Sequence, residues 1–261
     1  MVRRAREKSR SGIYHVMWRG ANRQEIFHDD EDCRKFLDIT RRYKLQSEMK
    51  IYAWCLMNNH VHFLVKEGSE ALSATMKRIG VSYVWYYNQK YDTTGHLFQD
   101  RFRSESVESR KSIFSAARYI HQNPVKAGMV NAVDEWKWSS SLSYFGNQNT
   151  LHEPKGLLDQ DYILQLLSED ADTAREKFRI FNEEINQDKF LEDTPVKRRL
   201  TDEEAKVGIK ALLGTIEIPQ VKSLPKAERD VLIGKMKKIK GLSQRQAARI
   251  LGISANIISK A

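Results

Sequence analysis

Long apolar stretches are missing from this sequence of 261 residues. No window reaches the ~18 consecutive apolar residues that a membrane-spanning helix needs, so no such span is expected. The basic residues at the start are not followed by an apolar segment, which is not the pattern of a secretory signal. With 41% apolar residues the chain can still bury a core. Its length allows one large domain or two modest ones.

Cysteine is also scarce. The two cysteines, Cys33 and Cys55, form neither a CxxC pair nor a disulfide framework. Internal repeats and low-complexity tracts are absent as well. The simplest interpretation is a protein of the reducing cytoplasm.

Acidic residues are too few to balance the basic ones. The 34 Asp and Glu residues face 44 Lys and Arg residues, which leaves a net charge of +10. The excess gathers in "MVRRAREKSR" (1–10) and "KMKKIK" (235–240). This pattern favours binding to a polyanion. Basicity alone leaves open a soluble protein with solvated lysines.

The pattern of apolar residues predicts alternating strands and helices in the first half of the chain. Strands are expected at 13–21, 49–57, 60–66 and near 101–108, and helices at 29–46, 71–91 and 109–124. Ser109 is expected to cap the last of these helices and Pro124 to mark its end. The order β-α-β-β-α-β predicts an α+β fold, a ferredoxin-like split βαβ sandwich with an antiparallel sheet.

Strand signals stop after residue 150. Residues 156–185 are expected to form two helices, residues 189–199 suit a linker, and residues 201–261 are again helical in pattern. We therefore expect a domain at 1–150, a helical extension and linker at 151–199, and an all-α domain at 200–261.

Two histidines stand two residues apart in the predicted strand "HVHFLVK" (60–66). Side chains alternate along a strand, so His60 and His62 point to the same face, about 7 Å apart along the backbone. That geometry lets two imidazoles converge on one metal ion. A pair of core or surface histidines satisfied by hydrogen bonds fits the same pattern.

A second pair lies on the predicted helix that contains "YIHQNP". Tyr119 and Asn123 are four residues apart and share a helix face. A phenol oxygen and an amide carbonyl oxygen can then approach the same point in space. An aromatic core position beside a capping Asn is the alternative.

These motifs resemble a known family. "NHVHFLV" (59–65) resembles the histidine–hydrophobic–histidine (HUH) motif of single-tyrosine transposases, and "YIHQNPVKAG" (119–128) resembles the tyrosine helix of their REP-associated branch. Two further blocks, at 14–27 and 95–104, are similar to that branch. The resemblance spans about residues 10–146.

The resemblance implies a nuclease and strand transferase that cuts single-stranded DNA. Its expected target is a repetitive palindrome that contains a hairpin. Tyr119 is the implied nucleophile, and His60, His62 and Asn123 are the implied metal ligands. Attack on phosphorus would leave a 5′-phosphotyrosyl link and a 3′-hydroxyl. Imidazole ligands suit Mn²⁺ better than Mg²⁺, and we expect either ion to serve.

Several basic residues are candidates for DNA binding. Arg101 and Arg103 are expected on one strand face, where they contact the DNA backbone or form a solvated pair. The arm with Arg3, Arg4 and Arg6 is either a solubilising tail or a segment that enters a groove at the foot of a hairpin. His15, on the first strand, is within reach of the site, although packing or a phosphate contact is the favoured interpretation.

The end of the chain, "LSQRQAARILGISANIISKA" (242–261), fits a helix-turn-helix. Ser243 is expected to cap the first helix and Gly252 to lie in the turn. Gln244 and Arg245 are candidate contacts to duplex DNA. An ordinary helical hairpin is the alternative.

The sequence therefore predicts a transposase, in the bacterial cytoplasm near the nucleoid, with no membrane partner. It acts as a monomer or a homodimer. A non-catalytic DNA-binding regulator on the same scaffold remains the alternative function.

Overall fold

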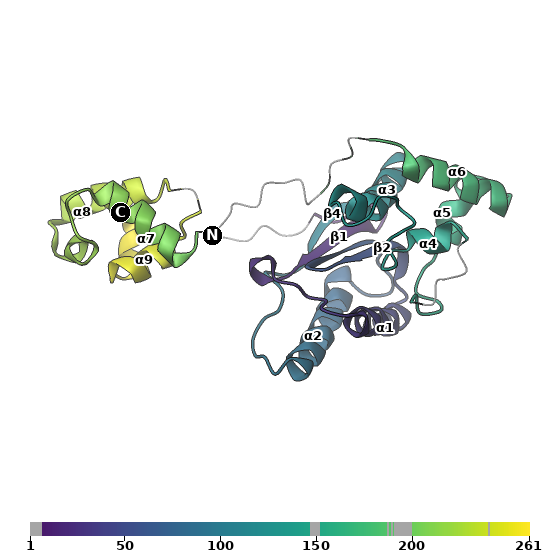
Figure 1. Cartoon of the computed structure of the whole chain (residues 1–261), viewed down its shortest axis with the longest axis horizontal. Coiled ribbons are helices and arrows are strands. Elements are labelled where there is room, and N and C mark those ends of the chain that lie inside the picture. Colours follow the sequence, from purple (N-terminus) through teal and green to yellow (C-terminus); the bar gives the residue numbers. More distant parts are fainter. Residues whose placement is uncertain (1–6, 147–151, 187, 189, 191–199, 240) are drawn as a thin grey trace. The chain divides into compact units, whose positions relative to one another are not determined.

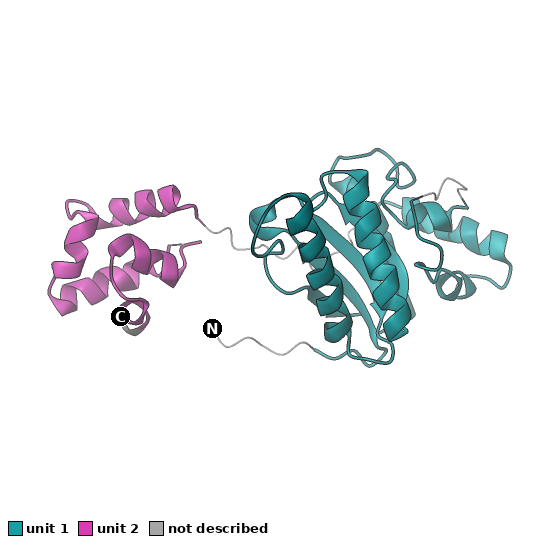
Figure 2. Cartoon of the chain, turned by 90° about the horizontal axis from the view of Figure 1, so that it is seen from below, with its two compact units in different colours: residues 1–194 teal, residues 195–261 magenta. Residues whose placement is uncertain are grey.

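The computed structural model describes residues 7–146, 152–186, 188, 190, 200–239 and 241–261. The chain divides into two compact units, residues 1–194 and residues 195–261 (Figure 2). Among the described residues, no helix is long and apolar enough to cross a membrane.

A four-stranded antiparallel sheet forms the centre of the first unit. Its strands are β1 (Ile13–Arg19), β2 (Lys50–Met57), β3 (His60–Lys66) and β4 (Arg103–Ser106). They lie in the order β2-β3-β1-β4, and each neighbouring pair is antiparallel. With the helices α1 and α2 placed after β1 and β3, this is the ferredoxin-like split βαβ arrangement, which confirms the predicted fold.

One face of the sheet is covered by α1 (Asp30–Ser47) and α2 (Leu72–Lys90), which Figure 1 shows together on one side of the strands. The Asp29 carboxylate caps α1 by accepting a hydrogen bond from the Asp32 backbone N–H. Alternate strand residues turn to this face because side chains alternate along a strand. Those from β1 and β3 are fully apolar and join one core cluster: Tyr14, Val16, Trp18, Val61, Phe63 and Val65.

The opposite face is covered by α3 (Arg110–Lys126) (Figure 1). Ser109 caps this helix in a reciprocal capping box with Ser112, as predicted. Pro124 does not end it, however, and lies inside the last turn. Proline removes only one donor there, and the Asn123 and Pro124 carbonyls still accept from Ala127 and Met129. The helix can therefore continue to Lys126.

Short helices extend the layer that contains α3. They are α4 (Ser141–Tyr144), α5 (Asp161–Gln165) and α6 (Ala171–Glu183). Phe178 of α6 packs on Tyr144 at 4.4 Å between ring centroids. Both rings belong to the core cluster that α3 forms with β2. The segment 156–185 thus holds two helices, as expected, and they add to the core of the first unit.

The second unit is built of helices over residues 200–239 and 241–261, with no strand in those ranges. Its elements are α7 (Asp202–Leu213), the 3-10 helix η2 (Ile218–Ser223), α8 (Lys226–Met236), α9 (Gln244–Leu251) and α10 (Ala255–Lys260). Ser243 caps α9, and Gly252 ends it in the left-handed region at φ 65°. Leu251 and Ile258 are buried in this unit's own core. Two helices are thus present in the segment predicted to be a helix-turn-helix, α9 and α10, with Gly252 between them.

Candidate functional site

Three histidines gather on the face of the sheet that α3 covers. His60 and His62 lie on β3, and His15 lies on the neighbouring strand β1. The Nε2 atom of His15 and the Nδ1 atom of His62 are 3.0 Å apart in a hydrogen bond, and the two rings stack at 5.2 Å. The His60 ring meets the His62 ring edge-on at 5.0 Å. The alternation of the strand therefore brings both predicted histidines to one place, and His15 reaches the same place.

The phenol ring of Tyr119 packs against this histidine cluster. Its centroid lies 5.6 Å from that of His15 and 5.9 Å from that of His62. Tyr119 is buried in the centre of α3. The Nζ atom of Lys126, two turns further along α3, lies 4.7 Å from the centre of the Tyr119 ring. The ring of Tyr119 from α3 thus meets two imidazoles from the sheet, and the cation of Lys126 lies over that ring.

Hydrogen bonds at the Nδ1 atoms orient the two histidines of β3. His60 Nδ1 lies 2.6 Å from the Oδ1 atom of Asn59, an oxygen that only accepts, so His60 donates there. His60 then carries its lone pair on Nε2. If His62 donates from Nδ1 to His15, the same holds for His62. Metal-binding histidines usually donate their other ring N–H in this way, so these side chains fit a metal ion.

Histidine and acidic side chains alone do not complete a metal site. No group of three or more His, Cys, Asp or Glu side chains that could hold a metal ion occurs in the described part of the chain. Asn123 is buried on the same helix as Tyr119, and its Nδ2 atom donates to the Tyr119 carbonyl oxygen at 3.0 Å. That bond uses the amide nitrogen and leaves Oδ1 as the atom that can bind a cation.

The edge strand β4 adds charged residues to this face. Arg103 pairs with Met17 and Glu105 pairs with His15 across the antiparallel ladder, so both side chains lie on the histidine face. Partial burial raises the pKa of the Glu105 carboxyl above its ordinary value. Arg101 was expected on the same strand face, but it lies before β4 begins. There the Asp100 carboxylate accepts from the Arg101 backbone N–H at 2.7 Å, and this local turn delays the strand.

The other candidate DNA contacts lie outside the described residues or in the second unit. Arg3, Arg4 and Arg6 lie outside the described residues. Gln244 and Arg245 are exposed in the first turn of α9, in the second unit.

Some neighbours of the cluster were not expected from the sequence. Phe190 packs on Tyr119 at 4.9 Å and on His15 at 5.3 Å between ring centroids. Asn59 was interpreted only as a turn residue, yet it orients His60. In the sequence, only the position of Asn59 directly before His60 could have indicated this contact.

Part of the chain matches a known protein family. Residues 8–123 match the family model described as "Transposase IS200 like". This region is thus similar to the IS200-like transposases. The matched range contains His60, His62, Tyr119 and Asn123, and it ends inside α3. The resemblance expected from the sequence is thus confirmed for the IS200-like region.

Individual relatives cover less of the chain. A "REP-associated tyrosine transposase" of Escherichia coli (strain K12) is 26% identical over 101 residues, which are 38% of this chain and 58% of that relative. A solved structure titled "Structure of the REP associates tyrosine transposase bound to a REP hairpin" is 19% identical, with a TM-score of 0.48. It covers 60% of this chain and 92% of its own chain.

Proposed function

We propose that this protein is a metal-dependent endonuclease and strand transferase that cuts single-stranded DNA with Tyr119. The observation that carries the proposal is the packing of the Tyr119 phenol against His62, on the same face as His60. The family match over residues 8–123 supports the same reaction.

The metal site of the proposal consists of His60 Nε2, His62 Nε2 and Asn123 Oδ1. The Nδ1 contacts of His60 and His62 support these roles, because they place or can place the lone pairs on Nε2. A bound Mn²⁺ or Mg²⁺ ion would polarise the scissile phosphate. Two imidazoles favour Mn²⁺, whereas the abundance of Mg²⁺ in cells favours Mg²⁺.

In the proposed step the Tyr119 oxygen attacks the phosphorus atom. A P–O bond to tyrosine forms, the bond to the 3′ oxygen breaks, and the leaving oxygen takes up a proton. The products are a 5′-phosphotyrosyl link and a 3′-hydroxyl, and the reverse attack rejoins strands without ATP. A phenol with a pKa of about 10 must first lose its proton. Lys126, whose Nζ atom lies 4.7 Å from the centre of the Tyr119 ring, is the cation beside that phenol.

The proposed substrate is a single strand that carries hairpins, as the family resemblance implies. The net charge of +10 supports binding to a polyanion. Arg103 lies on the face with Tyr119 and is a candidate for a phosphate contact. Arg101, together with the arm that holds Arg3, Arg4 and Arg6, is proposed to contact DNA further from the reaction.

The second unit is proposed to bind duplex DNA. Its α9–α10 pair has the capped start and glycine turn of a helix-turn-helix. Gln244 and Arg245 are exposed at the start of α9, where the backbone N–H groups of a helix favour phosphate. This unit also favours the second candidate function, a regulator that binds DNA without cutting it.

A cleavage assay separates the two functions. Labelled hairpin oligonucleotides are incubated with the protein and Mn²⁺ or Mg²⁺, with and without a chelator. The nuclease yields cut strands only with the metal. Retarded DNA on a native gel, with no cut strand under any metal condition, would support the regulator instead.

A further inference from the structure

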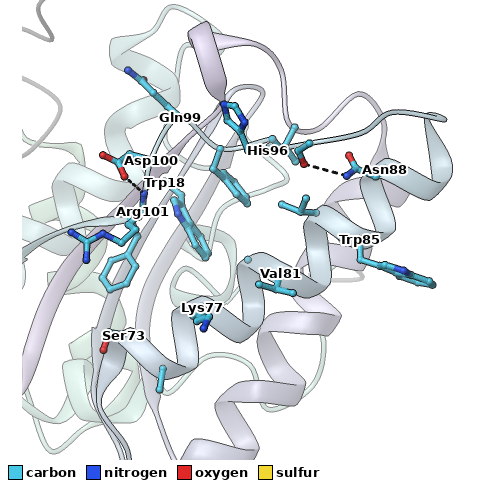
Figure 3. A pocket seen from close by; sticks show the side chains of 17 residues that line it. Trp18, Ser73, Lys77, Val81, Trp85, Asn88, His96, Gln99, Asp100 and Arg101 are labelled. Carbon is cyan, nitrogen blue, oxygen red and sulfur yellow. Dashed lines mark hydrogen bonds between the residues drawn. The ribbon is translucent and has the colours of Figure 1, made fainter. Parts of the chain in front are cut away.

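A large open pocket lies on the side of the sheet away from Tyr119. It has a volume of about 940 Å³ and is formed by α2, the segment 95–102 and Trp18 of β1. Figure 3 shows Val81 and Lys77 of α2 on one side, with Trp18 and Arg101 across from them. None of the residues that line the pocket is a proposed metal ligand or the proposed nucleophile.

The floor of the pocket is a rigid aromatic surface. The Trp18 indole stacks on Phe98 at 4.6 Å and meets Phe102 edge-on at 6.1 Å. Gly80 of α2 lies directly against this indole, and a Cβ atom there would come within 2.6 Å of the Trp18 ring. A glycine at this helix position therefore allows the indole to reach the helix and form the floor.

The wall of the pocket exposes large apolar side chains. Val81 is 61% exposed and Trp85 is 68% exposed, one turn apart on α2. Neither position is needed to cover the core, which the buried face of α2 covers with Ile79 and Tyr83. Exposed apolar and aromatic side chains that gather at a pocket mark a binding surface.

The rim of the pocket carries two cations and one carboxylate, Asp100, and so a net positive charge. Lys77 and Arg101 both line it and are both exposed. Within the described residues, no carboxylate forms an ion pair with Lys77 or Arg101. The pocket therefore combines an aromatic, apolar interior with positive charge at its edge, which is the combination that complements a nucleotide.

We propose that this pocket binds an unpaired base of the DNA substrate, with the adjoining phosphates against Lys77 and Arg101. The inference rests on the proposed function for its ligand, but it concerns a separate site. Trp18 pairs with Val61, which lies between His60 and His62 and points to the opposite face. The pocket thus backs onto the histidine cluster, and a strand that passes round the edge strand β4 can occupy both faces.

The test uses Val81→Glu, which places a carboxylate in the pocket at an exposed position. Fluorescence anisotropy measures binding to a hairpin with unpaired flanking nucleotides and to a blunt hairpin without them. Stacking contributions predict at least about tenfold weaker binding to the first DNA and no change for the second. Ile180→Glu, at an exposed position of α6, is the matched control and should bind both DNAs as the wild type does.

A second variant and two further measurements keep the test decisive if Val81→Glu does not fold. Trp85→Ala should show the same selective loss if Val81→Glu fails to fold, as checked by circular dichroism. Cross-linking of 5-iododeoxyuridine in the unpaired flank should modify a peptide from α2 or from 95–102. The wild-type protein could cut no DNA while the pocket variants still bind the flanked hairpin more weakly. That result would support the pocket and contradict only the nuclease proposal.

Three results would overturn the inference. One is wild-type affinity of both pocket variants for the flanked hairpin. Another is an equal loss for both DNAs, which would indicate a general charge effect. The third is a DNA-free wild-type dimer, seen by sedimentation velocity, that Val81→Glu dissociates, because the surface would then bind a second copy.

Discussion

The two faces of the sheet are made by the same strands, yet they differ in chemistry. Toward α1 and α2, β3 contributes Val61, Phe63 and Val65 to an apolar core. Toward α3, the alternate residues of the same strand include His60 and His62, which contact each other, and His62 also meets Tyr119. Period-two alternation thus lets one strand stabilise the fold and supply a site at once. Neighbouring residues should therefore respond to mutation in opposite ways.

The largest expected effect comes from Phe63→Ala on the apolar face. Phe63 is fully buried and stacks near Phe36, so the cavity should lower the free energy of unfolding by about 3–5 kcal/mol. On the other face, His62→Gln should abolish metal-dependent cleavage but cost at most about 1.5 kcal/mol, the value of a lost hydrogen bond. Urea unfolding measures both variants. Equal destabilisation, with cleavage retained in His62→Gln, would remove the distinction between the faces.

His121, a buried histidine of α3, has a structural role and can be compared with the histidines of the proposed site. His121 is buried between α3 and α6, where Nδ1 donates to Asn182 Oδ1 at 2.9 Å and Nε2 lies 2.8 Å from Ser140 Oγ. Burial lowers the pKa of His121 from 6.5 to about 4. His121 therefore binds a proton more tightly in the unfolded chain than in the folded protein. Its contribution to the stability of the folded state is complete above pH 6.5.

Stability should accordingly fall as the pH drops from 6.5 through about 4, by about 3 kcal/mol in total from this residue. Urea unfolding across that range measures it, with His121→Gln as the control that cannot titrate there. A His121 resonance that titrates near 6.5 in the folded protein would contradict the assignment.

A smaller effect should follow from His15→Phe. The new ring can keep the packing on Tyr119 and Phe190, but it removes the hydrogen-bond partner of His62 Nδ1. Loss of such a partner typically weakens metal binding about 10–100-fold. Cleavage measured against Mn²⁺ concentration should shift to higher concentration by that factor. His28→Phe, which removes contacts to Tyr87 and Glu25 but none to the histidine cluster, should leave the metal dependence unchanged.

Local rules were enough to predict much of the fold. Alternation identified β1 and β3 and placed His60 and His62 on one face, and capping chemistry located the starts of α3 and α9 at Ser109 and Ser243. These features depend on residues a few positions apart. The ferredoxin-like order of strands followed from the order of the elements.

Features set by distant contacts could not be predicted. Pro124 stays helical because its neighbours keep their hydrogen bonds, and Arg101 leaves β4 because Asp100 forms a local turn. Phe190 reaches His15 from far along the chain. Strand alternation fixes which side a residue faces, but it does not say what a later segment places above it.

The most direct measurement concerns the Tyr119 hydroxyl. Wild-type protein and Tyr119→Phe are incubated with a labelled hairpin oligonucleotide and Mn²⁺, denatured, and digested for mass spectrometry. We predict a DNA adduct on the peptide that contains Tyr119 in the wild type and none in the variant, with DNA binding unchanged. An adduct that persists in Tyr119→Phe, or that maps to another residue, would contradict the account.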